Sequence, residues 1–275
     1  MKADRIRRFS PLDRLFHLTL MLTFLIQSAT GFSRLFITTG WGRKLSGVFG
    51  GYEGALVVHR WVGVFMLLGF AVHIGVLISR IRWKDPKGSI FGPDSLVPNE
   101  NDFRRFAQQV AWFFGRREAP RHDRWTYWEK FDYWAVFWGM PLLGATGLML
   151  MFPMISSRYF EGWVLNVAAL LHRAEAILAV SYIFIVHFFI GHLRPSSFPM
   201  NEAMFSGSVP VAHAAEEKPE WVARLKAEGR LEDAAAAAPA SWYRVAYFVF
   251  GYTALCVGIY LLINAVAYSR FVQLH

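Results

Sequence analysis

Five long stretches of this chain are almost entirely apolar, and polar segments separate them. A helix that crosses a bilayer needs about 20 mostly apolar residues. The five predicted spans are Leu15–Phe36, Ala55–Ser79, Tyr133–Phe152, Val164–Leu193 and Tyr243–Tyr268. The first is not expected to be a cleaved signal peptide, because Arg34 and Phe36 stand where a small-residue cleavage site would lie. The predicted fold class is therefore an all-α integral membrane helical bundle.

Basic residues are concentrated in alternate polar segments. Residues 1–14, 80–130 and 194–240 carry 21 lysines and arginines, whereas the polar segments on the other side (34–54, 153–163 and the end after the fifth span) carry 5. Because basic loops stay in the cytoplasm, we expect a cytoplasmic N-terminus and a periplasmic C-terminus in a bacterial inner membrane. This distribution explains the net charge of +9. No nucleic-acid motif accompanies it, so nucleic acid is not an expected partner.

The two longest cytoplasmic segments differ in character. Asn101–Gly115 alternates polar and aromatic residues at helical spacing, which predicts a helix lying on the inner membrane surface in contact with lipid. Ala212–Pro239 combines a charged stretch with the run Ala234–Ala238. It predicts a cytoplasmic arm with partial helix, and a solvated linker is the alternative for its second half.

The composition excludes several kinds of cofactor site and directs attention to the histidines. The chain is 55% hydrophobic and 18% charged and has one cysteine, Cys256. A single cysteine excludes a disulfide scaffold, a four-cysteine zinc site, an iron–sulfur cluster and a CxxCH haem attachment. Six of the nine histidines lie within or at the ends of predicted spans: His17, His59, His73, His172, His187 and His192. Such groups are costly in a bilayer, and each indicates a functional role or a satisfied polar contact.

The spacing of these histidines favours haem. His59 and His73 are 14 residues apart and His172 and His187 are 15 apart, which corresponds to about four helical turns and ~21–22 Å. Each helix thus carries one histidine near each face of a hydrocarbon core about 30 Å thick. Such helices can hold two b haems, one per leaflet, through paired axial imidazoles. We expect His59 and His172 at the outer haem, and His187 with His17 or His73 at the inner one.

Neighbouring residues fit this hypothesis. Arg60 and Arg173 directly follow the outer histidines and can pair with haem propionates, or else extend to lipid phosphate. The sequences SATGF (28–32) and GATGL (144–148) resemble each other, as do VVHR (57–60) and LLHR (170–173), which suggests that spans 1–2 and 3–4 are related by duplication. Zinc would need three or four ligands converging on one point, and a proton relay would need more intramembrane carboxylates than Glu175.

Several motifs together resemble one family. They are PLDRLFHL (11–18), VVHRWVG (57–63), EKFDYW (129–134), ATGLMLMFP (145–153), LLHRAEAILA (170–179), IVHFF (185–189) and FPMNEAMFSGSV (198–209) followed by KPEW (218–221). They resemble the cytochrome b (gamma) subunit of respiratory formate dehydrogenases and related dihaem cytochromes b that act with multihaem c-type cytochromes. The resemblance covers roughly residues 8–230 and leaves out the fifth span.

This resemblance implies four axial ligands, His17, His59, His172 and His187, with His73 as the alternative to His17. It also implies a quinone pocket just before the third span, where Thr126 and Trp128 replace the family's asparagine and glycine and where Glu129, Lys130 and Asp132 offer proton-exchanging groups or an ordinary charged helix start. The implied domains are a four-helix dihaem core (1–194), a cytoplasmic arm (195–240) and an extra transmembrane helix (241–275).

The predicted function is electron transfer across the membrane by a dihaem subunit of a respiratory oxidoreductase. Its expected partners are a periplasmic iron–sulfur or multihaem c-type subunit and the quinone pool, with a possible quinone-reducing or quinol-oxidising site. Two alternatives are a haem relay between proteins without a quinone site and a haem-free anchor or transporter.

Overall fold

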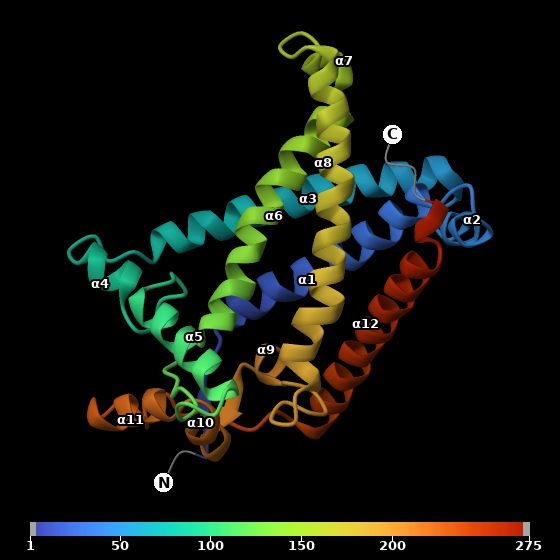
Figure 1. Ribbon diagram of the computed structural model, residues 1–275. Coiled ribbons are helices and arrows are strands. Elements are labelled where there is room, and N and C mark those ends of the chain that lie inside the picture. The colour runs from blue at the N-terminus through green and yellow to red at the C-terminus, as the bar shows by residue number, and fades with distance from the viewer. Residues whose placement is uncertain (1–3, 272–275) are drawn as a thin grey trace. The chain divides into compact units, whose positions relative to one another are not determined.

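The computed structural model describes residues 4–271 and is shown as a ribbon in Figure 1. Five of the described helices are long and apolar enough to cross a membrane. They are α1 (Pro11–Leu35), α3 (Gly51–Ser79), α6 (Tyr127–Met151), α8 (Gly162–Ser181) with its π-helical continuations η1 (Tyr182–His187) and η2 (Phe189–Leu193), and α12 (Ser241–Ala267). The predicted all-α membrane fold is confirmed. Each helix begins slightly before its apolar stretch, because helical hydrogen bonding continues into polar residues.

Shorter elements fill the polar segments. They are β1 (Arg5–Arg7), α2 (Gly40–Gly47), α4 (Pro86–Phe91), α5 (Glu100–Phe113), α7 (Pro153–Ser156), α9 (Ala203–Ser206), β2 (Ser208–Pro210), α10 (Val211–Glu217), α11 (Pro219–Ala227) and the 3₁₀ turn η3 (Ser269–Phe271). The helix expected over Asn101–Gly115 is present as α5. It starts with a capping box: the Asn99 side chain accepts from a backbone N–H in the first turn, and the Asp102 side chain accepts from the backbone N–H of Asn99.

The described chain divides into two compact units. The polar unit comprises residues up to Arg14, residues 75–137 and residues 201–244, and the helix unit comprises 15–74, 138–200 and 245 onward. The polar unit therefore gathers nearly the same three segments in which the basic residues are concentrated. Segment 201–244 packs with the N-terminus and with residues 75–137. The functional division at residues 194 and 240 stays a prediction.

An apolar core and a small sheet hold the polar unit together. The core consists of Ile6, Ala203, Val209, Ala214, Trp221, Val222 and Leu225. β1 pairs antiparallel with β2, which places Ile6 opposite Val209. The partial helix expected in the cytoplasmic arm is present as α10 and α11. The run Ala234–Ala238 is not helical, and its first half lies along β1 instead of forming a solvated linker: Arg7 donates to the Ala234 carbonyl, and Ala236 donates to the Arg5 carbonyl. These tertiary hydrogen bonds override the helix preference of alanine.

Buried ion pairs connect the segments of the polar unit. Glu129, at the start of α6, accepts from Arg8 (2.5 Å) and from Lys218 (2.6 Å), and Lys130 pairs with Asp102 at 2.8 Å. The Lys218 side chain is only 2% exposed. Burial lowers the pKa of its ammonium group and the Arg8 charge lowers it further, to about 8, although Glu129 opposes the shift.

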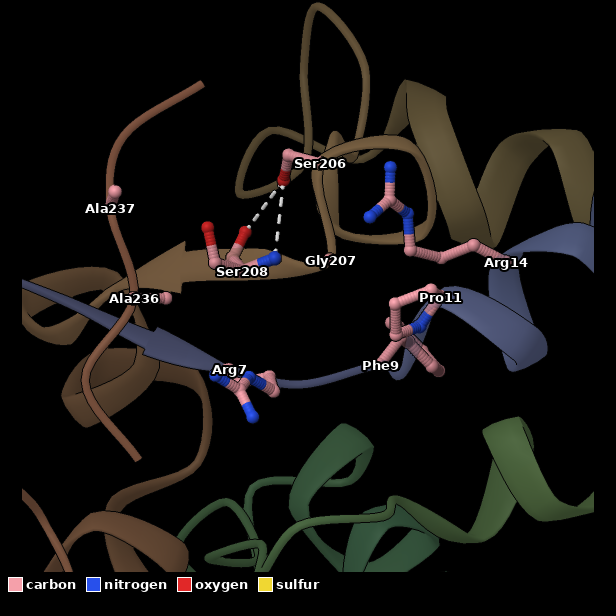
Figure 2. A pocket seen from close by; sticks show the side chains of 9 residues that line it. All are labelled: Arg7, Phe9, Pro11, Arg14, Ser206, Gly207, Ser208, Ala236 and Ala237. Atoms are coloured by element: carbon pink, nitrogen blue, oxygen red, sulfur yellow. Dashed lines mark hydrogen bonds between the residues drawn. The ribbon is translucent and has the colours of Figure 1, made fainter. Parts of the chain in front are cut away.

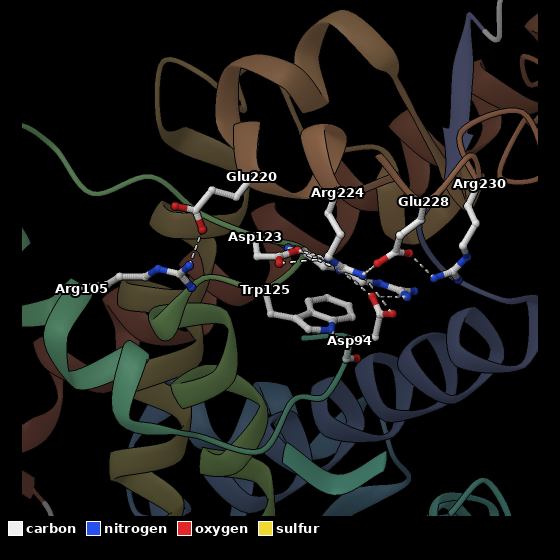
Figure 3. A network of polar contacts seen from close by, with 9 residues as sticks. Asp94, Arg105, Asp123, Trp125, Glu220, Arg224, Glu228 and Arg230 are labelled. Carbon is white, nitrogen blue, oxygen red and sulfur yellow. Dashed lines mark hydrogen bonds and ion pairs between the residues drawn. The ribbon is translucent and has the colours of Figure 1, made fainter. Parts of the chain in front are cut away.

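A second, more exposed network centres on Arg224 of α11 (Figure 3). Its guanidinium donates to Asp94 (3.0 Å) and Asp123 (2.8 Å), and the Trp125 indole donates to the Asp94 carbonyl. Burial by itself raises the pKa of the Asp94 carboxyl, but the hydrogen bond and charge of Arg224 and the charge of Arg124 outweigh that effect and hold this pKa below its usual value. The network ties α11 to the two loops that flank α5.

The helix unit has an aromatic core. Phe32, Phe36, Trp41, Val180, Phe184, Phe188 and Leu261 are buried together. Phe32 lies on α1 and Trp41 on α2, with Phe36 between these helices. Phe184 lies on η1 and Phe188 directly after it, while Leu261 comes from α12. Most side chains on the outer faces of the long helices are exposed and apolar, as expected of helices that face lipid.

Candidate functional site

The helix unit brings two pairs of histidine rings together. The ring centres of His59, on α3, and His172, on α8, lie 6.2 Å apart with their planes at 78°. The ring centres of His17, on α1, and His187, on η1, lie 6.4 Å apart with their planes at 38°. Because His172 and His187 lie 15 residues apart on one continuous helical segment, the two pairs lie at different depths along it.

These separations can be compared with two imidazoles that ligate one metal ion. Metal–imidazole bonds are about 2.0–2.1 Å long, and a ring with bonds near 1.33 Å has its centre about 1.1 Å from each nitrogen. Two imidazoles on opposite sides of an ion therefore have ring centres about 6.3 Å apart. Both observed pairs fit this value. Among the described residues no group of three or more His, Cys, Asp and Glu could hold a metal ion. Two facing imidazoles at this separation suit an iron whose other ligands come from a porphyrin.

Hydrogen bonds favour one tautomer of the His59 and His172 rings. The Thr30 hydroxyl lies 2.7 Å from the Ile26 carbonyl and 2.9 Å from Nδ1 of His59; with its single hydrogen donated to the carbonyl, its oxygen accepts from Nδ1. In the same way the Thr146 hydroxyl donates to the Leu142 carbonyl and accepts from Nδ1 of His172 (3.0 Å). With Nδ1 protonated, the lone pair is on Nε2, the nitrogen left to bind a metal.

Two glycines next to these threonines give the rings room. A Cβ atom on Gly147 would lie 3.2 Å from Cε1 of His172, and one on Gly31 would lie 3.6 Å from Cε1 of His59. The sequence ATG, which occurs in α1 and again in α6, thus makes the same contacts twice. Its threonine hydrogen-bonds the histidine of the following spanning helix, and its glycine leaves space for that histidine ring. The resemblance between spans 1–2 and 3–4 is therefore also a structural one.

The remaining candidate histidines do not pair with a histidine of another helix. The His73 ring makes an edge contact with Phe16, with the ring centres 4.8 Å apart. The His192 ring lies 6.3 Å from that of His187 and nearly perpendicular to it, a separation as short as in the two pairs, but both residues belong to the same helical segment, five residues apart. Of the two candidates for the position opposite His187, the structure therefore brings His17 into a paired arrangement and places His73 against a phenylalanine.

The arginines next to His59 and His172 differ in position. Arg60 is exposed and Arg173 is half-buried. Arg34, which sequence reasoning did not select, lies at the end of α1, where its guanidinium stacks on the ring of Tyr52 on α3, the helix that carries His59. Its position one turn beyond Thr30 is the signal that could have identified it, because residues four apart lie on the same helix face.

The charged start of α6 is part of the polar unit's interior. Glu129 is bonded to Arg8, Lys218 and Thr126, and Lys130 is bonded to Asp102. The two alternatives considered from sequence were proton-exchanging groups and an ordinary charged helix start. Both residues do lie at the charged start of α6, and their ion pairs connect α6 to segments distant in sequence. A proton-exchanging role stays a prediction.

A cavity of about 310 Å³ also lies in the polar unit (Figure 2). Its lining is Arg7, Phe9, Pro11, Arg14, Ser206, Gly207, Ser208, Ala236 and Ala237. Gly207 adopts a positive φ of 81°, and a Cβ there would meet the Arg14 side chain at 3.2 Å. Arg14 donates to the Tyr243 hydroxyl (2.8 Å). The cavity contains none of the histidines.

Comparisons with known proteins agree with this geometry. The family described as prokaryotic cytochrome b561 matches residues 8–207, which include all six membrane histidines. This chain belongs to the prokaryotic cytochrome b561 family. Two curated relatives are the formate dehydrogenase cytochrome b556 subunit of Haemophilus influenzae, 25% identical over 79% of this chain and 82% of the relative, and the nitrate-inducible formate dehydrogenase cytochrome b556 subunit of Escherichia coli, 22% identical over 84% of this chain and 97% of the relative.

Membership of a cytochrome b561 family has direct consequences. The protein is a multi-pass protein of the bacterial inner membrane that holds b-type haem and takes part in electron transport. The resemblance to the cytochrome b subunits of formate dehydrogenases, which the motifs indicated, is confirmed. Since the family match ends at residue 207, it includes the paired histidines and leaves out α12.

Proposed function

We propose that this protein is a dihaem cytochrome b subunit that transfers electrons across the inner membrane between a periplasmic redox partner and the quinone pool. The observation that carries the proposal is the presence of two histidine pairs, both at the ring separation that suits ligation of one iron, at two depths of one helix unit. A bound b haem supplies reversible one-electron transfer. Two such groups at different depths would connect the two faces of the membrane.

The proposed axial ligands are His59 and His172 at the outer site and His17 and His187 at the inner site, with His73 as the alternative to His17. Thr30 and Thr146 hold the outer imidazoles with Nε2 available, as partners of metal-bound histidine commonly do. Arg34, Arg60 and Arg173 supply positive charge near the outer site, where it favours anionic propionates.

The orientation follows from the charge distribution. The three basic segments that the structure gathers into the polar unit belong on one side of the membrane, and the positive-inside preference assigns that side to the cytoplasm. The N-terminus is then cytoplasmic and the C-terminus periplasmic. In the polar unit, α5 exposes the aromatic side chains of Phe103, Phe106 and Phe113, which suits contact with inner-leaflet lipid.

The named relatives indicate the class of partner. They are cytochrome subunits of formate dehydrogenase, and an electron-transfer subunit without its own iron–sulfur ligands requires a protein donor or acceptor. We infer that an iron–sulfur or multihaem c-type subunit docks at the outer end, next to His59 and His172. The quinone would react at the inner end, next to His187.

Haem content of histidine variants tests the ligand assignment. The purified wild-type complex should contain two protohaems per chain in a pyridine haemochrome assay. His59→Ala or His172→Ala should remove one, and His17→Ala or His187→Ala the other. His73→Ala is the matched control and should retain both. Loss of a haem from the His73 variant, with both retained in the His17 variant, would move the inner ligand to His73.

Reduction by a quinol tests the quinone role separately. A quinol analogue should reduce the haems of the isolated complex, and a quinone-site inhibitor should prevent it. If the haems respond only to the protein partner, the chain is a relay between proteins.

A further inference from the structure

The fifth transmembrane helix, α12, lies outside the family match and bears none of the membrane histidines. Its side chains nevertheless divide sharply into two faces. Tyr247, Ala254, Gly258 and Leu261 are buried, whereas Val249, Val257, Ile263 and Val266 are exposed. Buried positions at intervals of seven, four and three form one continuous helix face. α12 therefore packs into the helix unit along a defined seam.

Gly258 is the closest point of that seam. A Cβ atom at this position would lie 2.6 Å from the Phe184 ring and 3.0 Å from the Phe188 ring. Both distances are shorter than ordinary van der Waals contact, so only glycine leaves room for the two rings as they stand. Phe184 and Phe188 are themselves 5% and 9% exposed, and their ring centres are 5.2 Å apart.

These two phenylalanines belong to the segment that carries His187. They lie three residues before it and one residue after it, where the fourth span changes from α-helix to π-helix. The rings of His187 and Phe188 are 6.3 Å apart, and Phe184 also contacts Phe24 of α1, the helix of His17. A π-helical segment is less stable than an α-helix and persists where tertiary contacts support it.

Two further contacts hold α12 in this position. The Tyr252 hydroxyl donates to the Pro199 carbonyl in the loop after η2 (2.8 Å). Near the other end of the helix Tyr268 stacks on Trp41, with ring centres 5.9 Å apart and planes at 10°. The seam is therefore supported on both sides of Gly258.

We propose that α12 is a positioning element for the inner site. The rings of Phe184 and Phe188 fit into the space that Gly258 leaves free on α12. This contact holds the π-helical segment in place, and with it the orientation of the His187 ring and the apolar side chains around that ring. The inference rests on the proposed function, in which His187 ligates a haem. The potential of a buried haem depends on the orientation of its ligands and on its exclusion of water. α12 would therefore act on one of the two haems and leave the other unchanged.

Graded substitution of Gly258 in the full-length complex tests this proposal. Gly258→Ala and Gly258→Val should lower the midpoint potential of one haem, more for valine, because displaced rings admit polar surroundings that favour the ferric form. They should also change the low-spin ferric signal of that haem in electron paramagnetic resonance. Haem content should stay at two. Ala246→Val, on an exposed position of α12, is the matched control and should leave both potentials unchanged.

Compensation separates positioning from a general loss of stability. Phe184→Leu combined with Gly258→Ala restores space at this contact and should return the potential toward the wild-type value. Unchanged potentials in Gly258→Val, or equal shifts of both haems, would overturn the inference while leaving the dihaem function intact. A wild-type complex without two haems would instead refute the proposed function itself.

Discussion

The hydrogen bonds that Thr30 accepts from His59 and Thr146 accepts from His172 lead to a quantitative prediction. Replacing either threonine with valine keeps the branched shape and removes the oxygen that accepts from Nδ1. The imidazole then loses a hydrogen bond that makes it a more electron-rich ligand. Since an electron-rich ligand favours the ferric state, the midpoint potential of the outer haem should rise in both variants.

The size of the shift has an upper bound. A typical hydrogen bond contributes about 0.5–1.5 kcal/mol net, and for a one-electron couple a tenfold change in equilibrium, about 1.4 kcal/mol, corresponds to about 59 mV. If the whole bond were lost from the ferric state alone, the potential would rise by about 20–60 mV. The actual shift should lie at or below this range, because the ferrous state keeps part of the interaction.

Optical redox titration of the full-length complex measures this shift. Thr30→Val and Thr146→Val should affect the same haem, because His59 and His172 face each other. Thr30→Ser and Thr146→Ser keep the hydroxyl and should restore the potential. Thr23→Val is the matched control, since Thr23 is equally buried on α1 but its hydroxyl bonds only to carbonyls of its own helix. Unshifted potentials in both valine variants, or an equal shift in Thr23→Val, would refute the tautomer argument.

Three further predictions concern the polar unit and the orientation. Lys218→Met should lower the free energy of unfolding by about 3 kcal/mol in denaturant titrations, because it removes one buried partner of Glu129. Asp94→Asn should reduce the loss of stability on acidification: Arg224 helps to depress the pKa of Asp94, so its contribution is present above about pH 4 and is lost as the pH falls below that. In a Cys256→Ser background, Ser157→Cys should react with a membrane-impermeant thiol reagent added to whole cells.

Each of these three predictions has a control or a result that would contradict it. Arg104→Met removes an exposed ion pair and should leave stability unchanged; an equal loss in both variants would mean that burial does not explain the effect of Lys218→Met. Parallel pH profiles of wild type and Asp94→Asn would show that the Arg224 network does not contribute to acid stability. Lys87→Cys should react only after cell lysis, and the reverse labelling pattern would invert the topology.

Sequence reasoning was most successful where hydrophobicity alone decides the outcome. All five spans were located, because a bilayer requires long apolar helices and excludes most alternatives. It predicted the partial helix of the cytoplasmic arm, found as α10 and α11, but gave no sign that Ala234–Ala236 lies along β1. That packing arises because β1 offers backbone hydrogen-bond partners from the other end of the chain. It also did not select Arg34, since no local pattern shows that a side chain at the end of α1 stacks on the Tyr52 ring of α3, the helix that carries His59.

The sequence by itself determined the number of membrane-spanning helices, the segregation of basic segments and the spacing of histidines along each helix, because these depend on helical geometry and on the cost of polar groups in lipid. Spacing also indicated the pair His59 and His172, but it left the partner of His187 open, because His17 and His73 are equally well placed in depth; only the family resemblance favoured His17. The tertiary structure places the His17 ring beside His187 and the His73 ring beside Phe16, because this choice depends on how α1 and α3 are rotated within the helix unit. The tautomer of the outer histidines and the docking of α12 at Gly258 likewise depend on contacts between helices, which residue spacing within one helix does not encode.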